Sequence, residues 1–373
     1  SVCQQTASEM ALVVQLLVLL LVSVPTDAKR PGPHCGDIRE RDQCLGEAGQ
    51  GLCAFCLTSE TCVSKEHNHC PKGCLFTELK PHLKSDQASP TCHIYKKPRN
   101  TTGFDEERAM RLVKLSGAAY CPPDFLRRWK CPRGKCVSGF TPELVVTDEG
   151  WELQAFAGID TKLADTPRIV VSFRGTVEAD IWNWVEDLHF TKIAPYEDKE
   201  IRVHRGFYNA FMTLRPRIIA YLDQAPKYPL VVTGHSLGAA MATLLAFDLS
   251  QTGKMRGFPS VSSLTFGEPR TGNHAFHKAF SKGVPDNWRV THAKDIVPKV
   301  PFQSFGFYHT AREVWYEDRK YEAERYKVCD GSGEDPHCQD SEWFSYSVED
   351  HLMYLGVLLG GDGCRPPPMS LEL

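Results

Sequence analysis

A serine between two glycines is the strongest chemical signal in this sequence. The pentapeptide GHSLG is centred on Ser236, after a short apolar run (228–233) and at the start of a Leu- and Ala-rich segment (236–250). The first run predicts a buried strand and the second a buried helix. A serine on a sharp strand-to-helix turn exposes its hydroxyl, and glycine on each side lets the turn close. The pattern indicates a nucleophile elbow; the alternative is a glycine turn between two core elements.

A serine nucleophile needs a base, and the base needs a carboxylate that orients it. In an elbow of this kind, the acid and then the histidine follow the serine along the chain. Asp295 lies in a loop after a predicted strand, where a carboxylate can reach across the top of a sheet. The later histidines are His309, His337 and His351. We select His351, because it opens a helix-like apolar segment and leaves enough chain to cross back over the sheet.

Several sequence blocks around these residues resemble the class 3 lipase family, the α/β-hydrolase family of secreted fungal triacylglycerol lipases. The blocks follow the family's order from about Phe104 to Gly360: GAAYC, IVVSFRGT, NWVEDLHF, VHRGF, VTGHSLGAA, TFGEPRTGN, DIVPKVP, HTAREVWY and EDHLMYLG. The resemblance implies an α/β fold, with a central sheet and flanking helices behind a small disulfide-rich module. It also implies that Ser236 is the nucleophile, Asp295 the acid and His351 the base.

The same resemblance implies an oxyanion hole and a substrate class. Thr176 resembles the family's oxyanion residue, whose backbone N–H acts together with that of Leu237; a strand-end turn is the alternative for Thr176. The implied reaction is hydrolysis of acylglycerol esters, triacylglycerol first, through an acyl-enzyme and without a metal or organic cofactor. A phospholipase A1 or another carboxylic-ester hydrolase is the close alternative, because a triad does not select the acyl or leaving group. A catalytically inert cysteine-rich binding protein is the remote alternative.

The segment that follows Thr176 carries an apolar stripe at helical spacing. The stripe consists of Ile181, Trp184, Val185 and Leu188, and Trp182 lies beside it. In the family that the chain resembles, a lid occupies this position and opens on lipid, so we expect a lipid–water interface as a partner. An ordinary core helix is the alternative, since an apolar stripe by itself marks burial.

The start of the sequence indicates secretion. The apolar run 11–24 after Met10 is too short to span a membrane and is typical of a signal peptide that ends near Ala28. We therefore interpret residues 1–28 as upstream sequence and signal peptide, with Lys29-Arg30 as a candidate further processing site. An uncleaved membrane anchor is the alternative.

Cysteine usage agrees with an extracellular location. Of the 15 cysteines, all but Cys3 follow Met10. The number of cysteines after Met10 is therefore even, as expected when all of them pair in disulfides. Residues 29–98 are rich in cysteine and too few to bury a large core, so we expect disulfides to hold them together. The run CAFC at Cys53 is weakly similar to the plexin-semaphorin-integrin module, which suggests a protein or glycan ligand. Zinc is the alternative to disulfides there, although we expect no metal site.

Residues 99–373 form the expected catalytic domain. The resemblance to class 3 lipases implies disulfides between Cys121 and Cys364 and between Cys131 and Cys136, which leaves Cys329 and Cys338 for each other. The polar boundary before this domain contains Asn100 in an Asn-Thr-Thr glycosylation acceptor. A net charge of −3 argues against nucleic acid as a partner.

Overall fold

The computed structural model describes residues 53–56, 61–64 and 103–364, apart from 132–135, 178–182, 184, 186–187, 252–254, 324 and 343–346. The chain divides into two compact units, Ser1–Lys96 and Lys97–Leu373. In the first unit, β1 (Cys53–Cys56) and β2 (Thr61–Ser64) form an antiparallel hairpin.

Several of the expectations above lie outside the described residues. They are the signal peptide, the glycosylation acceptor Asn100, and the disulfides or ligand of the cysteine-rich module. Among the helices that are described, none is long and apolar enough to cross a membrane.

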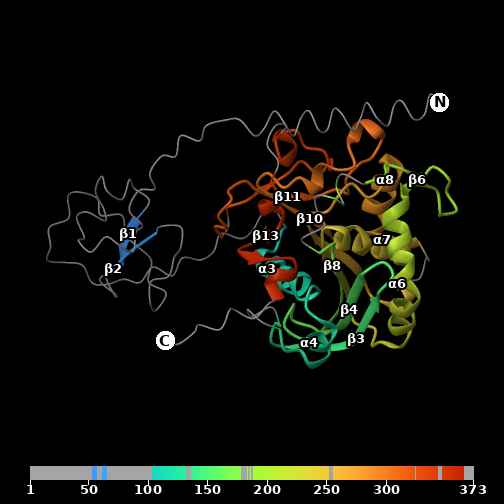
Figure 1. The fold of residues 1–373 in the computed structure, drawn as a ribbon, viewed down its shortest axis with the longest axis horizontal. Helices are drawn as coiled ribbons and strands as arrows, with labels where there is room; N and C mark the ends of the chain where they lie inside the picture. The colour runs from blue at the N-terminus through green and yellow to red at the C-terminus, as the bar shows by residue number, and fades with distance from the viewer. Residues whose placement is uncertain are drawn as a thin grey trace. The chain divides into compact units, whose positions relative to one another are not determined.

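The second unit is built around an eight-stranded sheet (Figure 1). Strands β5, β8, β9, β10 and β11 run parallel, and antiparallel neighbours extend the sheet at both edges. In order across the sheet, the strands are β12 (Lys327–Val328), β11 (Glu313–Tyr316), β10 (Asn287–His292), β9 (Val261–Phe266), β8 (Leu230–His235), β5 (Arg168–Phe173), β4 (Leu153–Asp160) and β3 (Phe140–Asp148).

The central strand β8 is apolar over most of its length because both of its faces are covered. Leu230 and Val232 join one hydrophobic cluster, whereas Val231 between them joins the cluster on the opposite face. Side chains that alternate across a strand buried on both faces are mostly apolar. The apolar run before Ser236, which predicted a buried strand, therefore corresponds to β8.

Helices pack on both faces of the sheet (Figure 1). On one face lie α6 (Arg205–Gln224), α7 (Leu237–Gln251) and α8 (His274–Gly283). The other face is covered by α3 (Glu106–Ala118), with α4 (Pro123–Arg128) beside it. Helix α7 is buried along almost its whole length, because it packs between the sheet and its neighbouring helices. The predicted central sheet with flanking helices is confirmed.

Short elements lie in the connections between the longer strands and helices and after the last strand of the sheet. They are β6 (Lys192–Ile193), β7 (Val203–His204), η5 (Met255–Gly257), η6 (Val297–Lys299), η7 (Gln303–Phe305), η8 (Gln339–Ser341), α9 (Val348–His351), β13 (Met353–Tyr354), β14 (Val357–Leu358) and η9 (Gly361–Cys364). Because the carboxyl ends of parallel strands meet at one edge of the sheet, residues after β8, β9 and β10 are brought together there.

Candidate active site

Ser236 occupies the turn between β8 and α7. Its φ is +60°, a left-handed backbone conformation that is uncommon for a residue with a side chain. The two flanking glycines leave room for this turn. A Cβ on Gly234 would overlap the Gly238 carbonyl, and a Cβ on Gly238 would overlap the Phe173 carbonyl. The glycines are therefore required by close backbone approach, as a nucleophile elbow demands.

The structure brings Asp295 and His351 into direct contact. His351 Nδ1 donates a hydrogen bond to Asp295 Oδ2 at 2.8 Å, and both side chains are fully buried. Asp295 follows β10, and His351 is the last residue of α9. The pattern of the apolar segment after His351 suggested a helix, but the segment is not helical. It forms the β13–β14 hairpin, whose turn at Leu355 and Gly356 has positive φ values of 49° and 70°.

Two further donors hold the Asp295 carboxylate. The Tyr354 hydroxyl donates to Oδ2, the same oxygen that accepts from His351, and the Val297 N–H donates to Oδ1 at 2.8 Å. Burial and the neighbouring Asp295 raise the pKa of Tyr354 well above its ordinary value, so this hydroxyl stays a donor. Sequence reasoning did not identify Tyr354, because its position in an apolar run after the histidine gives no sign of this contact.

Ser236 Oγ and His351 Nε2 are two of the buried polar atoms in the described part of the chain that have no hydrogen-bond partner. Since His351 Nδ1 is used by Asp295, the imidazole presents Nε2 as its proton acceptor. A buried polar group without a partner is uncommon and marks a site of function in many enzymes.

A second histidine fixes the main chain of His351. His235 Nε2 donates to the His351 carbonyl at 2.8 Å, and the Tyr120 hydroxyl contacts His235 Nδ1 at 2.7 Å. Because the carbonyl can only accept, His235 carries its proton on Nε2 and accepts from Tyr120 through Nδ1. The two imidazole rings lie 4.3 Å apart between centroids, so His235, the residue before Ser236, also supports His351.

Thr176 lies beside the nucleophile elbow. A Cβ on the preceding Gly175 would lie 2.8 Å from Ser236 Cβ, which shows how closely the segment after β5 approaches the serine. Thr176 Oγ1 is buried, without a partner in the described part of the chain. Thr176 and Leu237 both line a pocket of about 630 Å³. Leu237 is the first residue of α7, and a helix leaves its first N–H groups without partners inside the helix.

The predicted lid is described in part. Ile181, Trp182 and Trp184 lie outside the described residues, so their role stays a prediction. Val185 is helical and half-buried, and Leu188 is packed against the hydrophobic cluster of α6 and α7.

The other two candidate histidines are placed differently. His309 is buried, with Nε2 donating to the Pro298 carbonyl at 2.7 Å. Burial, together with the nearby Arg289 and Arg270, lowers the pKa of His309 well below its ordinary value. His337 is exposed in the loop before Cys338. His309 therefore supports the Pro298 main chain, whereas His337 lies on the surface.

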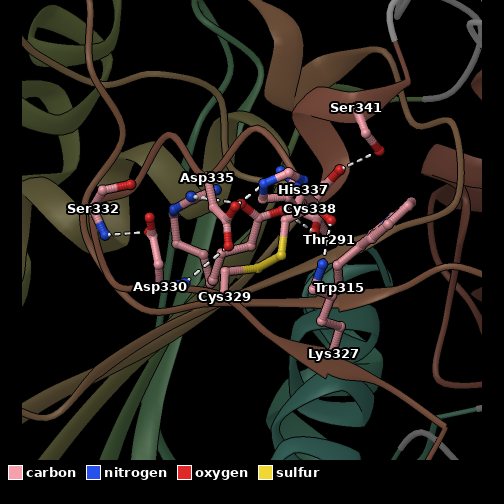
Figure 2. The surroundings of a disulfide bond; sticks show 12 residues. Thr291, Trp315, Lys327, Cys329, Asp330, Ser332, Asp335, His337, Cys338 and Ser341 are labelled. Atoms are coloured by element: carbon pink, nitrogen blue, oxygen red, sulfur yellow. Dashed lines mark hydrogen bonds and ion pairs between the residues drawn. A yellow bond between two sulfur atoms is a disulfide. The ribbon is translucent and has the colours of Figure 1, made fainter.

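Three disulfides are present among the described residues: Cys121–Cys364, Cys131–Cys136 and Cys329–Cys338. These are the pairs that the resemblance and the remaining cysteines led us to expect. Figure 2 shows Cys329 and Cys338 near Asp335, whose carboxylate lies close enough to the sulfurs to suggest a metal site. The two sulfurs are bonded to each other, so they are not available as thiolate ligands.

Comparison with known proteins identifies the family. Residues 170–305 match the model of the class 3 lipases. A lipase of Rhizomucor miehei is 36% identical over 239 residues, which cover 60% of this chain and 64% of that protein. A secreted mono- and diacylglycerol lipase of Penicillium cyclopium is 32% identical over 221 residues, covering 54% of this chain and 68% of that protein.

A solved structure agrees with these relatives. The structure of the Rhizomucor miehei triacylglyceride lipase is 29% identical and has a TM-score of 0.61, covering 69% of this chain and 96% of that one. The chain thus spans just under two thirds of the length of the first of these relatives and slightly more than two thirds of the second. With the sheet topology, the elbow and these matches in agreement, the chain belongs to the class 3 lipase family.

Proposed function

We propose that this protein is a secreted serine ester hydrolase that cleaves acylglycerol esters, with triacylglycerol as its principal substrate. The single observation that carries the proposal is the buried arrangement of Ser236, His351 and Asp295. The hydroxyl and Nε2 are without partners in the described part of the chain, while Nδ1 is bound to the carboxylate at 2.8 Å. An inert binding domain has no need of this arrangement, which places unpaired polar atoms in a hydrophobic interior.

The chemistry follows from these positions. His351 Nε2 accepts the proton of Ser236 Oγ as the oxygen attacks the ester carbonyl. The N–H groups of Thr176 and Leu237 donate to the oxyanion of the tetrahedral intermediate. His351 then protonates the leaving alcohol. Water attacks the acyl-enzyme in the same way, with His351 first as proton acceptor and then as proton donor to Ser236, and the fatty acid is released. Asp295 keeps the imidazole in the correct tautomer and stabilises its cationic form.

Lipid as the substrate is supported by the surface near the lid position. Phe302 and Phe305 are 41% and 40% exposed. The ring of Phe190, two residues after Leu188, contacts them edge-on and at a tilt, with centroid distances of 6.0 and 4.9 Å. Exposed aromatic side chains that gather in one place mark a surface for an apolar partner. The names of the relatives, lipase and mono- and diacylglycerol lipase, point to the same substrate class.

Secretion is supported by the name of a relative and by the disulfides. The Penicillium relative is a secreted enzyme by name, and this chain has disulfides within its catalytic unit. Disulfides persist in oxidising compartments, so we place the enzyme outside the cell.

A substrate panel tests the proposal. The purified protein is assayed on emulsified triolein, on phosphatidylcholine vesicles and on a dissolved short-chain aryl ester, with Ser236→Ala as the matched inactive control. We expect the highest rate on triolein and a loss of about 10⁶-fold in kcat for Ser236→Ala. Preference for phosphatidylcholine would identify a phospholipase A1 instead. Turnover that survives in Ser236→Ala would refute a serine hydrolase altogether.

A further inference from the structure

One side chain from a distant loop holds the main chain of Asp295. The Gln339 side chain donates from Nε2 to the Asp295 main-chain carbonyl at 2.6 Å, across 44 residues of sequence. Gln339 is 2% exposed and Asp295 is fully buried. Two residues before Asp295, Ala293 has a φ of +39°, a conformation that residues with side chains rarely adopt. Such a loop keeps its conformation through contacts from its surroundings.

The residues next to Gln339 contact the far end of the same loop. Lys299, at the end of η6, donates from Nζ to the Gln339 main-chain carbonyl. Asp340 forms an ion pair with Arg270 at 3.2 Å, and Arg270 Nη1 donates to the Lys299 carbonyl at 2.7 Å. Gln339 and Asp340 therefore bind both the beginning and the end of the Asp295 loop.

The Cys329–Cys338 disulfide connects this segment to the central sheet (Figure 2). On one side of the bond, the Cys329 N–H donates to the Glu313 carbonyl at the start of β11, at 3.0 Å. On the other side, Cys338 is fully buried and directly precedes Gln339. The Ser341 hydroxyl donates to the Cys338 carbonyl at 2.6 Å and closes the turn around Gln339. A continuous set of contacts thus leads from the sheet to Asp295.

We propose that Gln339 is a positioning residue for the Asp295 carboxylate, and that the Cys329–Cys338 disulfide holds Gln339 in place. The inference rests on the proposed ester-hydrolase function. Without the Gln339 amide, the Asp295 peptide loses a buried partner and can rotate, which moves the carboxylate relative to His351 Nδ1. The cationic imidazole that forms during the reaction is then less well stabilised, whereas ester binding is untouched. The loss therefore falls on kcat and not on KM.

Gln339→Met and Gln339→Glu form the central test. Methionine has nearly the same length without a donor, and a protonated glutamic acid restores the donor to the Asp295 carbonyl. On a dissolved short-chain ester, we expect Gln339→Met to lower kcat by about tenfold or more, with KM unchanged. The ratio of the kcat of Gln339→Glu to that of Gln339→Met should rise as the pH is lowered, because only the protonated acid donates.

A spectroscopic measurement separates positioning from a general loss of stability. The proton between His351 Nδ1 and Asp295 should give a far-downfield NMR signal in the wild-type protein. We expect Gln339→Met to shift or broaden this signal at temperatures where the protein is fully folded. A structural role elsewhere would leave the signal unchanged.

The disulfide is tested by Cys329→Ser combined with Cys338→Ser, or by mild reduction of the folded enzyme if that variant does not fold. Either treatment should lower kcat, and adding Gln339→Met should lower it little further, because both act through one contact. Replacing both Cys131 and Cys136 with serine is the control and should leave kcat unchanged.

Wild-type kcat and an unchanged NMR signal in Gln339→Met would overturn the inference, as would a change in KM alone. The Ser236→Ala control distinguishes this failure from failure of the proposed function. If Ser236→Ala is inactive while Gln339→Met is fully active, the positioning role is wrong and the hydrolase stands. If Ser236→Ala is active, the hydrolase itself is wrong.

Discussion

Gly267, the residue after β9, is packed directly against the Asp295–His351 pair. Its φ is +56°, and a Cβ at this position would lie 2.9 Å from Asp295 Oδ2 and 3.0 Å from His351 Nδ1. The contact with Asp295 is shorter than a real Cβ makes, and the contact with His351 is at the tight limit. Gly267→Ala must therefore move the Asp295 carboxylate and displace the His351 ring by a few tenths of an ångström. We expect this substitution to impair catalysis more than its small size suggests.

The expected magnitude has two parts. A left-handed backbone costs a residue with a side chain about 1–2 kcal/mol, which should appear as lost stability to unfolding. A displacement of about 1 Å in a catalytic group can lower the rate about 100-fold, so a shift of a few tenths of an ångström should reduce kcat by about 3- to 10-fold. Substrate binding should change little, because the glycine contacts the catalytic pair.

The matched control is Gly257→Ala. Gly257 has a φ of +83°, but the nearest atom to an added Cβ is 3.8 Å away, on the Lys227 side chain. Both variants therefore carry the cost of a left-handed backbone, but Gly267→Ala alone brings a Cβ too close to Asp295 and His351. We propose measuring kcat and KM on a dissolved short-chain ester below the unfolding transition, together with denaturant unfolding. Equal kcat in the two variants would refute the idea that this close packing sets the geometry of the catalytic pair.

Further expectations concern the base, the N-cap of α6 and the lid. His351→Ala should be about as damaging to kcat as removal of the nucleophile, whereas His309→Ala should retain turnover; an exchange of these outcomes in ester assays would show that the base is misassigned. Burial lowers the pKa of His204, the N-cap of α6, to about 4. The unfolded chain therefore binds this proton first, and acidification from about pH 6.5 to 4 should cost up to about 3 kcal/mol of stability. In His204→Asn, which keeps a capping side chain without a titrating group, denaturant unfolding should show a smaller loss over this pH range; an identical loss would contradict the assignment. Replacing Trp182 and Trp184 with serine should reduce activity on emulsified triacylglycerol more than on a dissolved ester, because large apolar side chains favour the lipid by about 1.5–3 kcal/mol each. Equal losses on both substrates would favour a fixed core helix.

The elbow was predictable from sequence because its constraints are local. A buried strand, a sharp turn and a buried helix each have their own pattern within a few residues of Ser236, and the structure places β8 and α7 within two residues of the predicted bounds. The order of serine, acid and histidine reduced the candidates for the base to a few positions. His351 was selected among them because of the apolar segment that it opens, and the resemblance to a family then agreed with that choice. The resemblance also implied two of the disulfide pairs and left Cys329 and Cys338 for each other.

The contacts around Asp295 were decided by the tertiary structure. Tyr354 and Gln339 lie 59 and 44 residues from Asp295 along the chain, and neither stands in a motif that marks it. The hairpin after His351 was mistaken for a helix, because a short apolar run has no period that distinguishes the two. Its strands are specified by a turn at Leu355 and Gly356 and by burial of Tyr354 beneath the catalytic pair.

The division has a physical reason. The candidate nucleophile can be identified from the sequence, because a strained strand-to-helix turn needs glycine at fixed short spacing. The environment that makes the carboxylate and the imidazole effective is assembled from buried donors at the ends of separate strands and loops. Those donors come close to Asp295 and His351 only when the sheet brings the carboxyl ends of β8, β9 and β10 together. No local sequence pattern therefore predicts them.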